Sequence, residues 1–161
     1  MAQEASSSTS SKIISLKTVD GEIFEIQPSV AKQMKTVQGL IEELGENVTI
    51  PLKKVFSKEL PKIIEYCKKE IAGEITKDFE AEFAKDLNDE EVKVLFLAAN
   101  YLEANNLFEF LSQNIADRLE SKSVEYARKF FGVTNDFTPE EESKLREERA
   151  WSFRGIKEDE E

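Results

Sequence analysis

The order of strand and helix signals along the chain limits its fold class more than any other feature. Two β-rich runs, residues 12–18 and 22–26, are separated by Val19-Asp20-Gly21, a sequence that favours a hairpin turn. Residues 48–52 form a third strand candidate, which Pro51 places at a sheet edge or a strand end. Helical patterns follow through most of the remaining chain. This order predicts an α+β domain with a small N-terminal sheet.

Helices are expected where apolar residues recur at helical spacing or where capping residues open a segment. They cover residues 36–44, 57–71, 89–102, 106–120 and 124–131. In residues 57–71, apolar side chains at positions i, i+3, i+4, i+7 and i+11 share one face. Asn88 or Asp89 is expected to cap the third of these helices, and Ser123 the fifth.

Residues 72–88 lack such a pattern. They contain a glycine and many acidic residues, and few of their side chains are large and apolar. We therefore interpret them as a loosely structured acidic connection, with Phe79 and Phe83 docked on the body of the domain.

A further helix signal begins at Thr138, close to the C-terminal end. Thr138 can cap this helix, Pro139 suits its first position, and Glu141 completes a capping box. Up to Ala150, however, Leu145 is its only sizeable apolar residue. The helix therefore has a specified start but almost no face to bury.

The chain's only tryptophan, Trp151, follows this helix together with Phe153. One interpretation is that such aromatic residues simply pack the C-terminal helices together, and we keep it for Phe108 and Phe131. Trp151 and Phe153 have little of this segment to pack against. Because interface anchors are often aromatic, we interpret these two residues as contacts for another protein.

Composition argues against several classes of function. A net charge of −11 opposes binding to nucleic-acid phosphates and to anionic membranes. The chain has no histidine and one cysteine, which excludes histidine-based catalysis, an intrachain disulfide and a multi-cysteine zinc site. Cys67 lies on the apolar face of its helix, where we expect inert packing. No apolar run approaches membrane-spanning length, and the serine-rich start lacks a signal-peptide core, so we expect a soluble intracellular protein.

No constellation of residues supports catalysis. Asp86, Asp89, Glu90 and Glu91 lack the ligand spacing and central glycine of an EF-hand loop, so helix capping and solvation explain them better. The glutamates after Pro139 are best explained as a solvated helix face. We therefore expect no enzyme activity, no catalytic residue, no metal and no cofactor.

Several strings of residues together resemble a known family. Two are specific in combination, Ala98-Ala99-Asn100-Tyr101-Leu102 and Asn135-Asp136-Phe137-Thr138-Pro139-Glu140-Glu141-Glu142. Others are Asp20-Gly21-Glu22, Phe24-Glu25, Ile50-Pro51-Leu52, Ile63-Ile64-Glu65-Tyr66-Cys67-Lys68, Phe79-Glu80-Ala81-Glu82-Phe83, Leu95-Phe96 and Ile115-Ala116-Asp117. Over roughly residues 12–153 the chain resembles the S-phase kinase-associated (SKP) adaptor family of SCF ubiquitin ligases, as a divergent plant-type member. It departs from the family pattern at Phe79, where a Trp is usual, and at Lys53-Lys54.

The resemblance implies a domain organisation. It implies a BTB/POZ fold over residues 12–120, extended by F-box-binding helices over residues 121–155. A disordered serine-rich tail at 1–11 and an acidic tail at 156–161 are expected to flank them. Weak self-association of the unbound chain through exposed helices is left open.

The resemblance also implies two sets of binding residues. Asn100 and Tyr101 are expected to contact a cullin. Side chains within about residues 95–154 are expected to contact an F-box, namely Leu107, Leu111, Ile115, Phe137, Leu145, Trp151 and Phe153.

The implied function is that of a non-catalytic adaptor. It would bridge F-box proteins to a cullin, with its RING subunit, so that substrates are ubiquitinated and sent to the proteasome. The implied localisation is the nucleus and the cytoplasm. The alternative is a divergent F-box-binding escort or stabiliser that works without a cullin.

Overall fold

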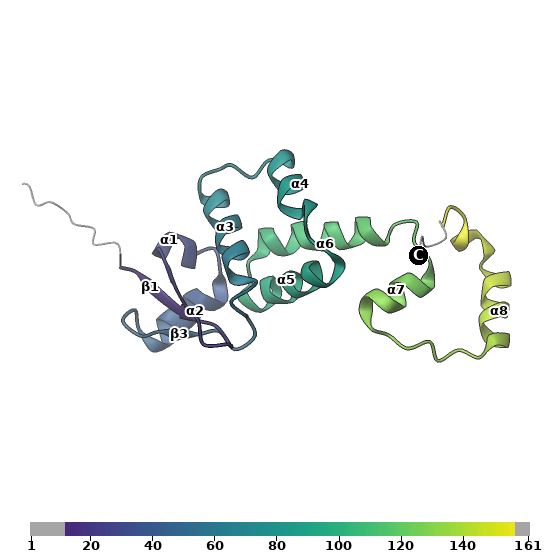
Figure 1. The fold of residues 1–161 in the computed structure, drawn as a ribbon, viewed down its shortest axis with the longest axis horizontal. Helices are drawn as coiled ribbons and strands as arrows, with labels where there is room; N and C mark the ends of the chain where they lie inside the picture. Colours follow the sequence, from purple (N-terminus) through teal and green to yellow (C-terminus); the bar gives the residue numbers. More distant parts are fainter. Residues whose placement is uncertain (1–11, 157–161) are drawn as a thin grey trace, which may run out of the picture. The chain divides into compact units, whose positions relative to one another are not determined.

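The structure, a computed structural model, describes residues 12–156. Its strands are β1 (Ile14–Lys17), β2 (Ile23–Ile26) and β3 (Ile50–Pro51) (Figure 1). Its helices are α1 (Pro28–Ala31), α2 (Lys35–Leu44), α3 (Leu60–Ile71), α4 (Lys77–Lys85), α5 (Asp89–Leu102), α6 (Asn105–Leu119), α7 (Val124–Phe131), α8 (Pro139–Glu148) and the short 3-10 helix η1 (Ala150–Phe153). The predicted tail at 1–11 and nearly all of the predicted acidic tail lie outside the described residues.

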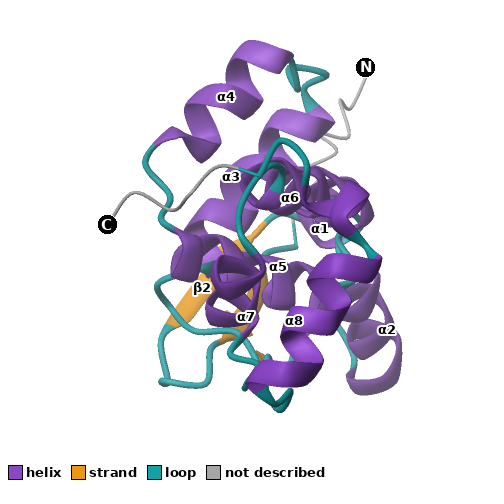
Figure 2. Cartoon of the chain, turned by 90° about the vertical axis from the view of Figure 1, so that its right-hand side faces the viewer, coloured by secondary structure: helices purple, strands orange, loops and turns teal. Residues whose placement is uncertain are grey.

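Helices make up most of the described chain, and the strands are confined to one small sheet (Figure 2). This arrangement confirms the predicted α+β class. The chain divides into two compact units, the first ending at Ser112 and the second beginning at Gln113, so the division falls within α6.

The sheet has three strands in the order β2-β1-β3. β1 and β2 form the predicted antiparallel hairpin, with Leu16 opposite Phe24. Gly21 lies in the turn at a φ of +88°, a conformation that glycine adopts without strain. β3 joins the other edge of β1 in parallel, with Leu16 opposite Ile50. Leu16 and Ile50 are fully buried, so one face of the sheet forms part of the core.

The core of the first unit is built around α3. This helix presents Leu60, Ile63 and Cys67 with no exposed surface. α1 packs against α3 and α2, and α2 packs against α5 and β3. The helix begins at Leu60 rather than at residue 57, because residues 57–59 form a turn.

That turn is tied to the hairpin by Asp20. The Ser57 backbone N–H donates to Asp20 Oδ1 at 3.0 Å, and the Ser57 hydroxyl donates to Asp20 Oδ2. The hydrogen bond from the Ser57 hydroxyl, with a second from Thr18, lowers the pKa of the Asp20 carboxyl to about 2. Asp20 therefore serves the hairpin turn and the start of α3 at once.

The prediction of a loosely structured connection at residues 72–88 was wrong for its central part, which forms α4. The Thr76 hydroxyl accepts a hydrogen bond from the Phe79 N–H at 3.1 Å and so caps this helix. Phe79 and Phe83 lie one helical turn apart, and their ring centroids are 6.1 Å and 5.7 Å from that of Tyr66 on α3. The expected docking of these two rings is confirmed. This apolar anchoring is what stabilises α4 as a helix.

Burial makes the Cys67 thiol a probe of the folded core. Desolvation, with a smaller effect of the nearby Glu70 carboxylate, raises the pKa of Cys67 to about 12. Since only the thiolate reacts, labelling by a disulfide reagent at pH 8 should be roughly 10³-fold slower in the folded protein than in denaturant. Stopped-flow absorbance measures both rates. Native labelling within tenfold of the denatured rate would contradict an inert, buried thiol.

Candidate protein-binding surfaces

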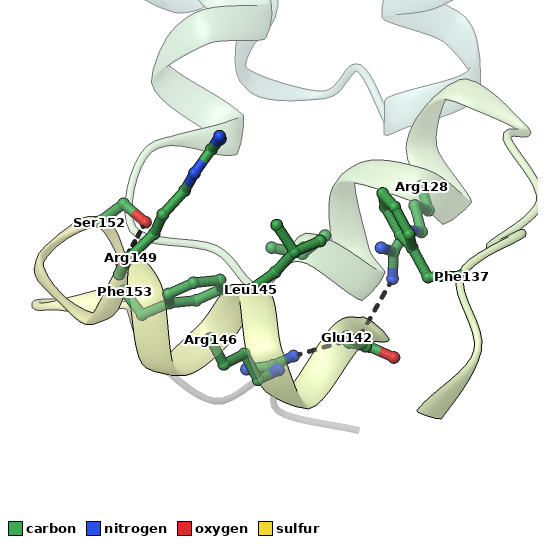
Figure 3. Close-up of a pocket in the computed structure, with 9 residues that line it drawn as sticks. Arg128, Phe137, Glu142, Leu145, Arg146, Arg149, Ser152 and Phe153 are labelled. Carbon is green, nitrogen blue, oxygen red and sulfur yellow. Dashed lines mark hydrogen bonds and ion pairs between the residues drawn. The ribbon is translucent and has the colours of Figure 1, made fainter. Parts of the chain in front are cut away.

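The second unit contains a groove of about 420 Å³ between α7, α8 and η1 (Figure 3). It is lined by apolar and charged side chains, namely Val124, Arg128, Phe137, Glu142, Leu145, Arg146, Arg149, Ser152 and Phe153. Three of these side chains, Phe137, Leu145 and Phe153, were predicted to contact an F-box. The fold therefore brings them together around one groove.

The wall that α8 contributes is largely charged. Glu142, Leu145 and Arg146 occupy positions i, i+3 and i+4, so they share one face of the helix, and Arg149 follows at its C-terminal cap. No residue of α8 is buried, and Leu145 is only half-buried. The predicted lack of an apolar face is confirmed, and α8 must be held in place by other interactions.

One of these interactions is the N-terminal capping box. The Thr138 hydroxyl accepts from the Glu141 N–H at 3.2 Å, while the Thr138 N–H donates to Glu141 Oε2 at 2.9 Å. Pro139 follows at the first helical position, as predicted. The box therefore defines where α8 starts.

Ion pairs between α7 and α8 also hold α8 in place. Arg146 on α8 lies 2.9 Å from Glu125 on α7, measured from Nη2 to Oε1. Arg128 on α7 lies 3.5 Å from Glu142 on α8. The Arg146 guanidinium also approaches Glu142 at 3.6 Å and lies 4.9 Å from the centre of the Phe153 ring. Arg146 thus links α7, α8 and η1.

Glu142 is held in its charged form. The Asn135 side-chain amide donates to it at 3.2 Å, and this hydrogen bond is the main cause that holds the pKa of Glu142 below its ordinary value. Arg128 and Arg146 lower it further, against the effect of desolvation. Figure 3 shows both arginines directed at this carboxylate. The negative charge at this end of the groove is therefore already balanced.

The aromatic residues near the C-terminal end differ in exposure. Trp151 is 71% exposed and is not among the side chains that line the groove, whereas Phe137 is 46% exposed. Phe153 is half-buried because Arg146 lies over its ring. The expectation that Trp151 finds little to pack against within the chain is confirmed for the described residues. Its role as an anchor stays a prediction.

The α6 residues expected to contact an F-box are not at the surface. Leu107 and Leu111 belong to the first unit and are 1% and 0% exposed, and Ile115 in the second unit is 8% exposed. Their spacing gives α6 a buried face. Direct contact with a partner would require these side chains to leave that environment, so this role also stays a prediction.

The predicted cullin-contacting pair lies on α5 in the first unit. Asn100 is exposed, and Tyr101 is half-buried. The Tyr101 carbonyl accepts from Thr36 Oγ1 on α2 at 2.6 Å, and its hydroxyl accepts from the Lys53 N–H after β3 at 3.2 Å. Tyr101 therefore joins three elements, while Asn100 remains available. Leu97, one turn earlier on α5, is 63% exposed and places an accessible apolar side chain near this pair, which the sequence pattern did not predict.

Three arginines that line the groove were also missed, Arg128, Arg146 and Arg149. A usable signal was present for two of them, because Arg146 and Arg149 follow Leu145 closely in the sequence. Arg128 carries no such signal. Its place at the groove depends on how α7 packs against α8.

Neither a metal centre nor a membrane span is evident within residues 12–156. No group of three acidic or cysteine side chains there is arranged to hold a metal ion. None of the helices in this range is long and apolar enough to cross a membrane. The surfaces described above are thus the features of this part of the chain that call for a functional explanation.

Comparison with known proteins assigns the chain to a class and a family. The small sheet covered by helices is a BTB/POZ-like fold, and residues 12–71 match the Skp1 family, tetramerisation domain, while residues 105–152 match the Skp1 family, dimerisation domain. SKP1-like protein 14 of Arabidopsis thaliana is 41% identical, with 90% of this chain and 99% of the relative covered. SKP1-like protein 1 of Oryza sativa subsp. japonica is 37% identical, with 88% and 95% covered. The chain therefore belongs to the Skp1 family of adaptor proteins.

The capping box yields a test of what holds α8. Thr138→Ala should destabilise the helix by about 1 kcal/mol, because the Glu141 N–H loses its side-chain acceptor. Hydrogen exchange of the α8 amides measures this as about a fivefold loss of protection. Ser143→Ala, an exposed change within the same helix, should cause no loss. Equal protection in both variants would show that the box does not hold the helix.

Proposed function

We propose that this protein is a non-catalytic adaptor subunit of an SCF-type E3 ubiquitin ligase. Its second unit binds the F-box of a substrate receptor through the groove and the exposed aromatic residues beside it. Its first unit binds a cullin around Asn100 and Tyr101. Membership in the Skp1 family supports this proposal, and the groove between α7, α8 and η1 is the observation that carries it.

The proposed mechanism is proximity. The F-box protein selects a substrate, and the RING subunit on the cullin brings the charged ubiquitin-conjugating enzyme. Holding both in one assembly raises the effective concentration of the reacting groups, so no catalytic residue is required of the adaptor. The modified substrate is then degraded by the proteasome. The proposed localisation of the adaptor is the nucleus and the cytoplasm.

The groove and the predicted cullin surface lie on different compact units, and this supports a bridging role. The groove lies wholly beyond Gln113, whereas Asn100 and Tyr101 lie before Ser112. A partner on one unit therefore does not need the side chains that the other partner uses. This separation predicts that each binding activity can be removed alone.

The F-box side is tested with Trp151→Ala. A side chain that is 71% exposed has little part in folding, so its loss should act on binding rather than on stability. Affinity for an F-box protein should fall at least about tenfold, a loss of about 1.4 kcal/mol, with cullin affinity unchanged. Ile23→Ala, at a site in the first unit that is 59% exposed, is the matched control. Unchanged F-box affinity by calorimetry would remove Trp151 from the interface.

The cullin side is tested with Asn100→Arg. A bulky charge on this exposed position should weaken binding to a cullin N-terminal domain at least about tenfold, with F-box affinity unaltered. Asn47→Arg, an exposed asparagine in a turn of the same unit, provides the control for added charge. If the two variants bind the cullin equally well, the contact surface lies elsewhere.

A second candidate is an F-box-binding escort that works without a cullin. The observation that favours it is the exposed pair Lys53 and Lys54, since the Lys53 N–H donates to the Tyr101 hydroxyl and the pair therefore borders the predicted cullin surface. Affinity purification separates the candidates. F-box proteins without any cullin or RING subunit would favour the escort, and all three together would favour the adaptor.

A further inference from the structure

We propose that the groove recognises an acidic side chain of its partner, and that Arg149 is the residue that pairs with it. The proposal rests on the proposed F-box binding and names the chemistry that the groove selects. The occupant is a helical F-box segment that presents apolar side chains next to a carboxylate.

The arginines of the groove are not equivalent. Arg128 is paired with Glu142, and Arg146 is occupied by Glu125, Glu142 and the ring of Phe153. Across residues 12–156, by contrast, the Arg149 guanidinium forms no ion pair, hydrogen bond or ring contact. Figure 3 shows its side chain extending away from the cluster around Glu142. Among the described residues, Arg149 is therefore the cation at the groove that is left for a partner.

The charge of the groove also differs from that of the chain. The whole sequence carries −11, yet within residues 12–156 three arginines and a single carboxylate line the groove. That carboxylate, Glu142, is already neutralised by two of the arginines. An acidic partner segment would be repelled by most of the surface but attracted here. Such a local reversal of sign favours one docking position over others.

The positive charge of Arg149 lies among apolar side chains of the groove. Leu145 lies on α8 and Arg149 is the residue that caps its C-terminal end, and both line the groove with Phe137 and Phe153. A partner that fills the apolar part with aliphatic side chains would cover Arg149. A covered guanidinium without an acceptor is costly, whereas a carboxylate can pair with it through two hydrogen bonds. A purely apolar or a basic segment therefore fits this groove less well than an amphipathic helix that carries Asp or Glu.

The test uses the full chain and an F-box protein that copurifies with the wild type. Calorimetry compares the wild type, Arg149→Glu, Arg149→Gln and Lys144→Glu. Lys144 lies on α8, is exposed and does not line the groove, so Lys144→Glu makes the same change of net charge away from the site. Each acidic residue of the F-box segment is also changed to Arg in turn and measured against Arg149→Glu.

We expect Arg149→Glu to weaken binding at least about tenfold and Arg149→Gln to weaken it less, with Lys144→Glu changing it less than about twofold. One reversed acidic residue of the F-box should recover most of the loss when paired with Arg149→Glu. This double-mutant comparison cancels any effect on the folding of α8.

Two failures are distinguishable. If the wild-type chain retains no F-box protein, the proposed function itself is wrong. If the wild type binds but Arg149→Glu behaves like Lys144→Glu, or no charge reversal in the F-box recovers binding, F-box binding stands and recognition of a carboxylate by Arg149 is overturned.

Discussion

The supply of apolar side chains along the chain is the constraint on which the rest of the structure depends. In the first unit, side chains such as Leu16, Ile63 and Leu102 have no exposed surface, and their burial stabilises the sheet and its helices together. In the second unit, α8 buries none of its residues. A capping box and the contacts of Arg146 hold that helix instead. The two units thus depend on different interactions.

This difference has a consequence for function. A helix fixed by its cap and by charged contacts keeps its place without covering its apolar neighbours, so Phe137 and Trp151 stay accessible. In a self-sufficient domain such residues would be expected in the core. Under the proposed function, they are the part of the interface that the partner completes. Under the same proposal, the charged groove would help to choose among partners, because apolar contacts alone discriminate weakly between helices of similar shape.

Much of the fold could be predicted because its signals are local. The caps at Asn88, Ser123 and Thr138 depend on residues three positions apart, and each forms in the structure. The hairpin turn at Gly21 is equally local. α4 was missed for the opposite reason. Its Phe79 and Phe83 look isolated in the sequence, and their partners Tyr66 and Phe110 come from distant helices.

For the candidate sites, too, contacts between residues far apart in the sequence could not be predicted. Leu107 and Leu111 follow a regular spacing that identifies a face of α6, but the spacing does not say whether that face meets the core or a partner. In the structure both are buried. Arg149 could be placed near Leu145 by counting residues. That its guanidinium has no partner in the described part of the chain, whereas Arg128 and Arg146 are paired, follows only from the structure.

Residue order alone determined the fold class, the helix starts and the weak apolar face of α8. These follow from spacing and capping, which act over one or two helical turns in whatever environment the segment has. The packing of α7 against α8 determined where the groove forms. It also determined that the Arg149 guanidinium has no partner within residues 12–156. Arg146 meets Glu125 across 21 positions of sequence. Such a pair exists only where folding brings the charges within a few ångströms, since the energy of the pair falls with distance and with screening by water.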